Sequence, residues 1–428
     1  MSVIPSIYLL LFLLILYKTE NACATLCVGS LAKGNWVKLI CGASNADLPL
    51  IRNLCYIYTL AGVDCIDVCA DSAVVRVAQE AIDAASTLDS ARSGPRPLLM
   101  ISVNDDEDPH FRKAVFDPRK CPIDCKRPCE KVCPAAAIPP LKTTSVTENK
   151  SENEGVIAER CYGCGRCEPV CPIGLIINEP YITNRDVIKE LFVPRPESDL
   201  RGVDAIEIHT HEGNEVEFES LWESIGETVL GQASVVSVSF PDMADYTATY
   251  INTLYNIMAR DKAHHEKFTR ERQGVHVWQT DGRPMSGDIG KGTAHASSEF
   301  ASRMLTALNA QNSGSGSERE DNIDLNSGRH FLQLAGGTNS HSVPTAHANG
   351  VLGQTGFGGF AFGGYARKML SQSLREVEEN APGARIEAGE HWVTLEACLE
   401  AARGLVRDVK GADRNSAPTQ GGMRGKGL

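Results

Sequence analysis

A run of four cysteines constrains the fold of this chain more than any other feature. The first three are separated by two residues each, the fourth comes three residues later, and a proline closes the run: Cys161, Cys164, Cys167, Cys171 and Pro172. This is the spacing of the bacterial ferredoxin motif, in which three thiolates hold one iron–sulfur cube and the fourth holds a second cube. Zinc sites instead use well-separated Cys-x2-Cys pairs. The run therefore predicts iron–sulfur clusters.

A second run lies upstream and has wider spacing. It keeps the closing Cys-x3-Cys-Pro, but three residues separate each of its cysteines from the next. If the fourth cysteine of each run crosses to the other cube, as in two-cluster ferredoxins, two sets of ligands result. One set is Cys121, Cys125, Cys129 and Cys171, and the other is Cys161, Cys164, Cys167 and Cys133. We expect two [4Fe–4S] clusters, and the wide spacing leaves a [3Fe–4S] cluster open for the first set.

The distribution of cysteines along the chain indicates metal ligation in a reducing compartment. The chain has 428 residues and 15 cysteines, and eight of these lie between Cys121 and Cys171. A disulfide scaffold would be short and would spread its cysteines along the chain. Gly163 and Gly165, which lie between the ligands, are expected to let the backbone approach the cluster sulfides and donate N–H groups to them.

Outside this Cys-rich region, short apolar runs alternate with amphipathic stretches, which is the pattern of βα units with a parallel sheet. Strands are predicted at residues 37–41, 65–69, 97–103, 204–209, 233–240, 275–279, 331–335 and 360–362. Helices are predicted at residues 47–61, 72–88, 185–192, 218–230, 246–260, 294–310, 366–379 and 393–409. Eight such units come near the ~250 residues typical of a (βα)8 barrel. We therefore expect an α/β fold built on a closed barrel, with an open doubly wound sheet as the alternative.

The Cys-rich region interrupts this pattern directly after the third predicted strand. The expected organisation is a first barrel part at residues 34–104, a ferredoxin-like 2[4Fe–4S] module at 105–180, a second barrel part at 181–410 and a disordered tail at 411–428. Parallel α/β domains carry their sites at the C-terminal ends of their strands. The clusters should therefore lie over the mouth of the barrel, within reach of a bound ligand.

The first 30 residues are set apart by an apolar run at residues 7–16. Its length matches the hydrophobic region of a signal peptide and is short for a membrane span. The Ala-Cys-Ala at residues 22–24 resembles a cleavage site, but no basic residue precedes Lys18. Three interpretations stay open: a signal or bipartite organelle presequence, a membrane anchor, and a wrongly predicted first exon.

Two glycine-rich segments after predicted strands suggest a site for an anionic ligand. Gly336 and Gly337 follow the seventh strand, and the last two loops of a barrel often form a phosphate site. Arg283 and Lys291 lie in the loop after the sixth strand, whose backbone N–H groups suit an anion. This loop is not a P-loop, because Gly292 rather than Ser or Thr follows the lysine.

The net charge of the chain limits the classes of molecule that it can bind. A nucleic-acid surface needs basic stripes, and a net charge of −12 argues against one. An acidic surface is compatible with a protein partner, so we expect a redox or regulatory protein. Contact with a membrane rests on residues 7–16 alone.

Four strings outside the cysteine runs carry a family resemblance. They are GNWVKLICGASN at 34–45, GVDCIDVCAD at 62–71, GVDAIEIHTH at 202–211 and QTDGRPMSGDIGKG at 279–292. Together with the two cysteine runs they resemble the LdpA family, the light-dependent period proteins of cyanobacteria and their plastid-bearing relatives. The resemblance runs from about Gly34 to Arg407 and covers both the ferredoxin-type clusters and an LdpA C-terminal domain. It implies an iron–sulfur protein that senses the cellular redox state and passes it to the circadian clock.

The resemblance also implies a chloroplast or other plastid as the location, with a cytoplasmic or membrane-anchored protein as the alternative. Three functions are compatible with the residues, and in the third the clusters are purely structural. The first is a non-enzymatic redox regulator or electron-transfer protein. The second is a barrel oxidoreductase that uses the clusters to reduce a ligand at the strand ends, where His209 is a candidate for acid–base work. The second function requires a mouth lined by polar groups and fails if apolar side chains fill it.

Overall fold

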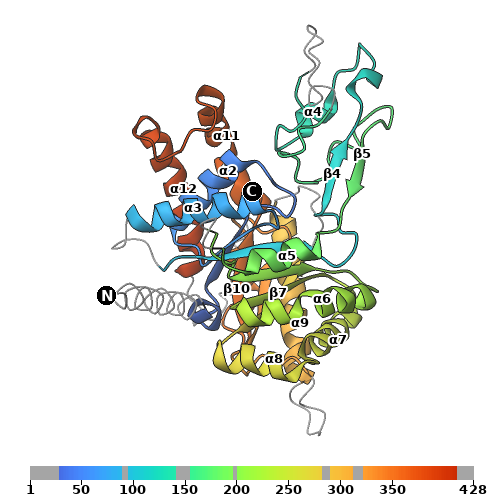
Figure 1. Cartoon of the computed structure of the whole chain (residues 1–428), viewed down its shortest axis with the longest axis vertical. Helices are drawn as coiled ribbons and strands as arrows, with labels where there is room; N and C mark the ends of the chain where they lie inside the picture. Colours follow the sequence, from blue (N-terminus) through green and yellow to red (C-terminus); the bar gives the residue numbers. More distant parts are fainter. Residues whose placement is uncertain are drawn as a thin grey trace, which may run out of the picture.

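The alternating strands close into a barrel of eight parallel strands in the computed structural model (Figure 1). The structure describes residues 28–88, 95–140, 155–195, 200–281, 290–311 and 322–411. The barrel strands, in the order of the chain, are β1 (Trp36–Ile40), β2 (Cys65–Cys69), β3 (Leu98–Asn104), β6 (Ala205–His209), β7 (Val235–Pro241), β8 (Val275–Asp281), β9 (His330–Ala335) and β10 (Phe357–Phe362). Because β1 pairs with both β2 and β10, the prediction of a closed barrel is confirmed and the open sheet is excluded.

The seam between the first and last strands requires a glycine. Gly359 of β10 lies opposite Trp36 of β1 and has φ +147°. A Cβ atom at this position would lie 2.2 Å from the Trp36 carbonyl oxygen, so a side chain would push the two strands apart. The register also shifts between Phe357 and Gly359 where β10 meets β9, as expected for a bulge that bends a strand into a closed sheet.

Helices connect the strands and cover the outside of the barrel (Figure 1). They are α2 (Leu48–Ala61), α3 (Ser72–Leu88), α5 (Arg185–Phe192), α6 (Glu215–Gln232), α7 (Thr247–Ala259), α8 (Lys262–Glu266), α9 (Lys291–Gln311), α10 (Ser342–Ala348), α11 (Gly364–Asn380) and α12 (Trp392–Lys410). Local signals explain their ends. The carboxylate of Asp47 accepts the Leu50 N–H at the start of α2, and Gly62 ends the helix with φ 86°.

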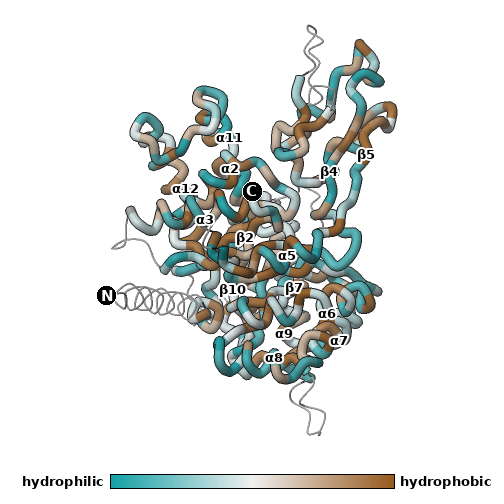
Figure 2. The backbone as a smooth tube through the Cα atoms, viewed as in Figure 1, coloured by the Kyte–Doolittle hydropathy of each residue, from teal (hydrophilic) through white to brown (hydrophobic). Residues whose placement is uncertain are grey.

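Two apolar layers lie on either side of the strands. The larger fills the space between strands and helices, and the brown stretches around β2 in Figure 2 belong to it. The smaller closes the N-terminal end of the barrel from inside and includes Leu31, Trp36, Met100, Val277 and Phe331. The barrel is therefore filled at its N-terminal end, as a packed core rather than a pore.

Residues 28–30, the described part of the N-terminal segment, join this closed end. The Ser30 hydroxyl donates to the Asp64 carboxylate (2.7 Å), which also accepts the Val37 N–H (2.7 Å) and an ion pair from Lys410 of α12. Residues 7–16 and the tail from 412 lie outside the described residues. Among the helices that the structure does describe, none is both long and apolar enough to span a membrane.

The chain between β3 and α5 leaves the barrel and forms a separate lobe (Figure 1). Here β4 (Arg112–Val115) pairs antiparallel with β5 (Ile177–Pro180), and α4 (Pro128–Val132) is a short helix. Asn104, the last residue of β3, ties both ends of this insertion together. Its amide donates to the carbonyls of Asp106 (2.7 Å) and Tyr181 (2.9 Å), and its Oδ1 accepts the Thr183 N–H (3.0 Å).

Candidate metal centres and the barrel mouth

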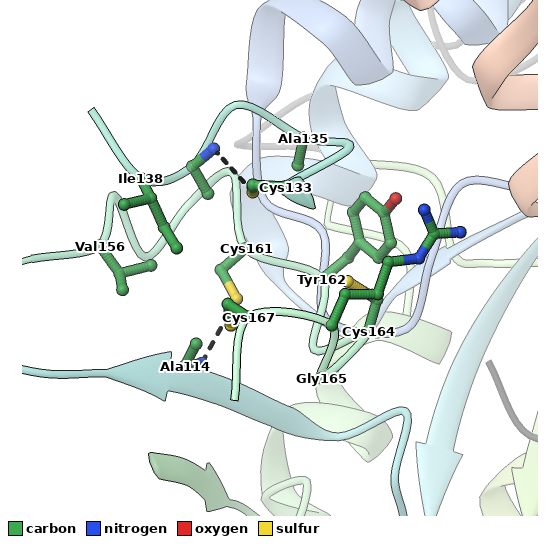
Figure 3. A pocket seen from close by; sticks show the side chains of 12 residues that line it. Ala114, Cys133, Ala135, Ile138, Val156, Cys161, Tyr162, Cys164, Gly165 and Cys167 are labelled. Carbon is green, nitrogen blue, oxygen red and sulfur yellow. Dashed lines mark hydrogen bonds between the residues drawn. The ribbon is translucent and has the colours of Figure 1, made fainter. Parts of the chain in front are cut away.

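Two cavities inside the insertion are each lined by four cysteines. The inner cavity is lined by Cys133, Cys161, Cys164 and Cys167 (Figure 3). The outer cavity is lined by Cys121, Cys125, Cys129 and Cys171. Cys133 and Cys171 each join the other run, so the fold assembles the same two sets of four that the crossing pattern predicts. All eight carry free thiols.

Backbone N–H groups point at the sulfur atoms of both cavities. The Ala137 N–H donates to Cys133 Sγ (3.2 Å), and the Leu175 N–H donates to Cys171 Sγ (3.3 Å). In both cases the donor lies four residues after the cysteine, because the chain turns back after each Cys-Pro. Such N–H···S contacts orient thiolates and stabilise their charge. Four converging thiols, N–H donors and apolar walls fit an iron–sulfur cluster in each cavity.

The glycines of the inner run have a structural requirement that the sequence does not reveal. Gly163 and Gly165 have φ of 69° and 70°, which favours glycine. A Cβ atom on Gly163 would lie 2.5 Å from the carbonyl oxygen of Arg112 in β4. The Arg112 guanidinium also donates to the Gly163 carbonyl (2.9 Å). Besides the predicted approach to a cluster, these glycines therefore let the ligand loop pack on β4.

The pKa values of the thiols show how readily each cysteine forms the thiolate that binds iron. Burial, with the neighbouring thiols Cys164 and Cys161, raises the pKa of Cys167 to about 12. Burial also raises the pKa of Cys171, but the N–H groups of residues 173–176 outweigh it and leave that pKa below its usual value. A bound iron ion would reverse the first shift, because its positive charge favours the thiolate.

The inner cavity lies against the barrel. Tyr162, between two inner ligands, stacks on the Arg367 guanidinium at the start of α11, 4.6 Å from the ring centre. Arg367 in turn donates to the Ile40 carbonyl at the end of β1 (2.7 Å). Lys113 of β4 donates to the Cys161 carbonyl (2.7 Å) and to the Ser44 carbonyl in the loop after β1. The inner ligand loop is thus fixed to the C-terminal ends of β1 and β10.

The surface near the outer cavity is apolar. Ile123, between two outer ligands, is fully exposed, and Ile173, which lines the cavity itself, is half-exposed. Ile177 of β5 is exposed to a similar degree. Exposed isoleucines are unfavourable in water and mark contact surfaces when they gather. The two cavities therefore differ in surroundings: one adjoins the barrel and the other adjoins exposed apolar side chains.

The interior of the barrel is polar above its apolar closed end. The Lys38 ammonium of β1 pairs with the Glu207 carboxylate of β6, and both side chains are buried. The Gln279 amide donates to Glu207 Oε1 (2.6 Å), and the Gln333 amide donates to Gln279 Oε1 (2.6 Å). Burial raises the pKa of Glu207, but Lys38 and His209 together outweigh it and lower the value to about 2. Burial dominates at nearby Asp67 and raises its pKa to about 7.

His209, the candidate from the fourth predicted strand, ends β6 at the mouth of the barrel. There it meets two residues of the insertion, Asp108 and His110, and the ring centres of the two histidines lie 5.1 Å apart. Asp281, the last residue of β8, lies 3.6 Å from His110. Burial lowers the pKa of His110, but the carboxylates of Asp281 and Asp108 outweigh it and raise the value to about 9. Polar and ionisable groups therefore line this part of the mouth.

The residues predicted for an anionic ligand are only partly brought together. The Gly337 carbonyl accepts the Thr293 hydroxyl (3.0 Å), which places Gly336 and Gly337 beside the first turn of α9, where Lys291 is exposed. These contacts use carbonyl oxygens, not the N–H groups that an anion needs. Arg283 lies outside the described residues. An anion site on these four residues stays a prediction.

Comparisons with known proteins agree with the site. Residues 121–182 match the LdpA Fe-S cluster-binding domain, and residues 199–314 and 319–408 match the light dependent period A C-terminal domain. The protein named light dependent period A from Synechococcus elongatus is 39% identical over 387 residues, covering 90% of this chain and 93% of the relative.

A carboxyl transferase domain of Rhizobium etli pyruvate carboxylase, in a solved structure, has 9% identity and a TM-score of 0.35. That similarity covers 93% of this chain and 53% of the other. The inference from sequence strings is confirmed by the family models and the cyanobacterial relative: the chain belongs to the light dependent period A family and is an iron–sulfur protein.

Proposed function

We propose that the protein holds two [4Fe–4S] clusters and uses them to sense or transfer electrons. The observation that carries this is the sorting of eight cysteines into two cavities of four, each with an N–H donor on its crossing cysteine. The inner cluster is held by Cys133, Cys161, Cys164 and Cys167, and the outer cluster by Cys121, Cys125, Cys129 and Cys171.

The two clusters have different roles in this proposal. The outer cluster exchanges electrons with a protein partner, because the exposed Ile123 and Ile173 beside it offer an apolar contact surface. The inner cluster passes the redox state to the barrel through Tyr162 and Arg367. The outer cluster is also the one that converts to [3Fe–4S], since its ligand run is the stretched one.

The biological setting follows from the relative. Its name describes a light-dependent period, so we propose that this protein reports redox state to a timing system through a regulatory protein partner. The relative comes from a cyanobacterium, and a plastid is the corresponding compartment in a eukaryote. The plastid location is therefore part of the proposal.

A second function, a barrel oxidoreductase, is favoured by one observation. The condition set by the sequence is that apolar side chains must not fill the mouth, and His110, His209 and Asp281 line it instead. In this function the inner cluster delivers electrons to a ligand at the strand ends, next to the buried pair of Lys38 and Glu207.

The experiment is anaerobic purification followed by iron and sulfide analysis and low-temperature EPR. Wild-type protein should hold about eight iron and eight sulfide per chain, and Cys164→Ser and Cys125→Ser should each lose about half. Cys398→Ser, a buried cysteine of α12, is the matched control and should keep both clusters. Iron well below seven per wild-type chain contradicts two four-iron clusters. Clusters that show no reversible one-electron reduction contradict the redox role.

A further inference from the structure

The barrel mouth holds a group of metal-ligating side chains that belongs to neither cysteine cavity. One ligand atom from each of Asp108, His110 and His209 lies within 4.8 Å of the others. His209 is the last residue of a barrel strand, whereas Asp108 and His110 lie at the start of the insertion, so the group forms only where the two parts meet. Asp281 Oδ2, at the end of β8, lies 3.6 Å from His110 Nε2.

His209 is the residue that a purely structural role leaves unexplained. Its side chain is buried, with 6% of the residue exposed, and its Nε2 makes no hydrogen bond among the described residues. That nitrogen lies 3.3 Å from Glu207 Oε1, which already accepts the Gln279 amide, without the alignment of a hydrogen bond. A buried nitrogen that lacks an aligned hydrogen bond costs up to about 1–3 kcal/mol, which a ligand bound to it would recover.

Asp108 is oriented as a ligating carboxylate would be. Its Oδ2 accepts from His211 Nε2 (2.6 Å), and its Oδ1 lies 2.8 Å from His110 Nδ1. The His211 contact fixes the carboxylate plane in the way that outer hydrogen bonds orient metal ligands. At metal–ligand bonds of about 2.0–2.2 Å, neighbouring ligand atoms lie roughly 3–4 Å apart, so a small opening of the group admits an ion.

From this geometry we propose that Asp108, His110 and His209 bind a divalent transition-metal ion at the barrel mouth. Two imidazoles with one carboxylate are the donors of Fe²⁺, Mn²⁺ and Zn²⁺ sites that keep open coordination positions. Asp281 is placed to supply a fourth donor atom, a carboxylate oxygen. Because metal availability and site geometry, rather than intrinsic affinity alone, decide which ion fills such a site, the class of ion is assigned rather than one element.

The site is mechanically joined to the inner cavity. His110 is two residues from Arg112, which donates to the Gly163 carbonyl between two inner ligands. Two residues further along, the Ala114 N–H donates to Cys161 Sγ (3.4 Å). The chain from 108 to 114 therefore runs from the metal site to the inner cysteines without an intervening turn of helix. An ion here lies on the barrel side of the inner ligands.

The test uses cluster-loaded full-length protein, freed of loose metal by a mild chelator, and Mn²⁺ as the probe. Mn²⁺ prefers carboxylate and imidazole to thiolate, so it does not compete for cysteines. Its EPR signal is readable because [4Fe–4S]²⁺ clusters are diamagnetic, and strictly anaerobic handling keeps the outer cluster in this four-iron form. Wild-type protein should bind about one Mn²⁺ per chain, and His110→Gln and His209→Gln should each bind it roughly tenfold or more weakly.

His264→Gln is the matched control, because His264 forms an exposed pair with Asp261 (2.6 Å) that resembles the proposed site in composition alone. It should leave Mn²⁺ binding unchanged. If either mouth variant loses its clusters, nitrogen hyperfine couplings of Mn²⁺ bound to the wild-type chain give the answer: imidazole couplings support the site. No stoichiometric binding, no imidazole coupling, or equal binding by the mouth variants overturns the proposal.

Discussion

The barrel and the insertion satisfy their buried groups in opposite ways. In the barrel, the buried Lys38 has Glu207 as its partner, and Gln279 and Gln333 complete the network from the protein's own side chains. In the insertion, the small described core is built in part from thiols: Ala114, Cys129, Ala137, Ile138, Val156, Cys161, Cys167 and Ile176. Lys38 and Glu207 are thus neutralised by other side chains of the barrel, whereas the thiols of the insertion are placed to bind an iron–sulfur cluster.

This difference teaches which part of the fold depends on a cofactor. A packed barrel of this size buries enough apolar surface to fold by itself. The insertion buries little, and binding of metal to thiolates that are far apart in the unfolded chain contributes directly to folding. We therefore expect the insertion to unfold without its clusters while the barrel stays folded.

The largest expected effect is that of removing the clusters. Anaerobic oxidation with a chelator should leave the backbone amides of residues 155–182 exchanging freely with solvent, whereas amides of the barrel strands stay protected. The measurement is hydrogen exchange by mass spectrometry on the same sample before and after iron removal. Protection that persists in β5, or is lost equally in β7 and β8, would erase the contrast between the two regions.

Replacing Lys38 should destabilise the barrel strongly and leave the insertion unaffected. Lys38→Met leaves the Glu207 carboxylate buried and unpaired, which costs roughly 3–5 kcal/mol of unfolding free energy. Urea unfolding followed by tryptophan fluorescence measures it, since Trp278 is buried in β8. The double variant with Glu207→Gln should regain most of the loss. Iron content should stay at the wild-type value, and a fall in iron would argue against independent regions.

Asp67 should give the barrel a pH dependence that the insertion lacks. Its pKa is about 7 in the folded state against an ordinary 3.8, because burial opposes its charge. Between these values the folded chain holds a proton that the unfolded chain releases, so stability falls as the pH rises from about 4 to about 7 and then levels off. Asp67→Asn should remove this fall. The measurement is the melting temperature of both proteins at pH values from 5.5 to 8. The same pH dependence in wild type and variant would refute the role of Asp67.

The smallest expected effect concerns the turns that follow the two crossing cysteines, Cys133 of the inner cavity and Cys171 of the outer cavity. Gly174 (φ 61°) lies three residues after Cys171, and Ala136 (φ 49°) lies at the same place after Cys133. A left-handed alanine is strained, so Ala136→Gly should stabilise the insertion by up to about 1 kcal/mol. Gly174→Ala is the reciprocal variant and should destabilise it. The rate of iron release to a chelator measures both effects. Rates equal to that of wild type would show that backbone strain at these positions does not affect the stability of the insertion.

The fold was predictable because its signals are local. The alternation of apolar runs located the eight barrel strands, and even β10 was anticipated from Phe360 to Phe362, although it begins earlier, at Phe357. The helices that were predicted agree with the structure to within three residues at each end. The short α8 and α10 were missed because a helix of one or two turns has no apolar stripe long enough to recognise.

The mouth could not be assembled from the sequence. His209 was a candidate without a partner, because Asp108 and His110 lie about a hundred positions away and on the other side of the insertion. Lys38 lies in the apolar run VKLIC, which predicts a buried strand but not the direction of the lysine side chain. Only closure of the barrel shows that it faces inward toward Glu207. The thiol sets were different, since the ferredoxin spacing itself encodes the crossing.

Asn104 has a consequence for how such a protein arises. Its one amide group contacts Asp106 where the chain leaves the barrel and Tyr181 and Thr183 where it returns. The two ends of a long excursion therefore begin and finish at one point, and β3 and β6 pair beneath it as direct neighbours. A segment attached in this way can be gained, lost or exchanged between genes without reordering the sheet, since closing a longer loop costs little. The barrel sheet therefore closes in the same way whether or not this cluster-binding insertion is present.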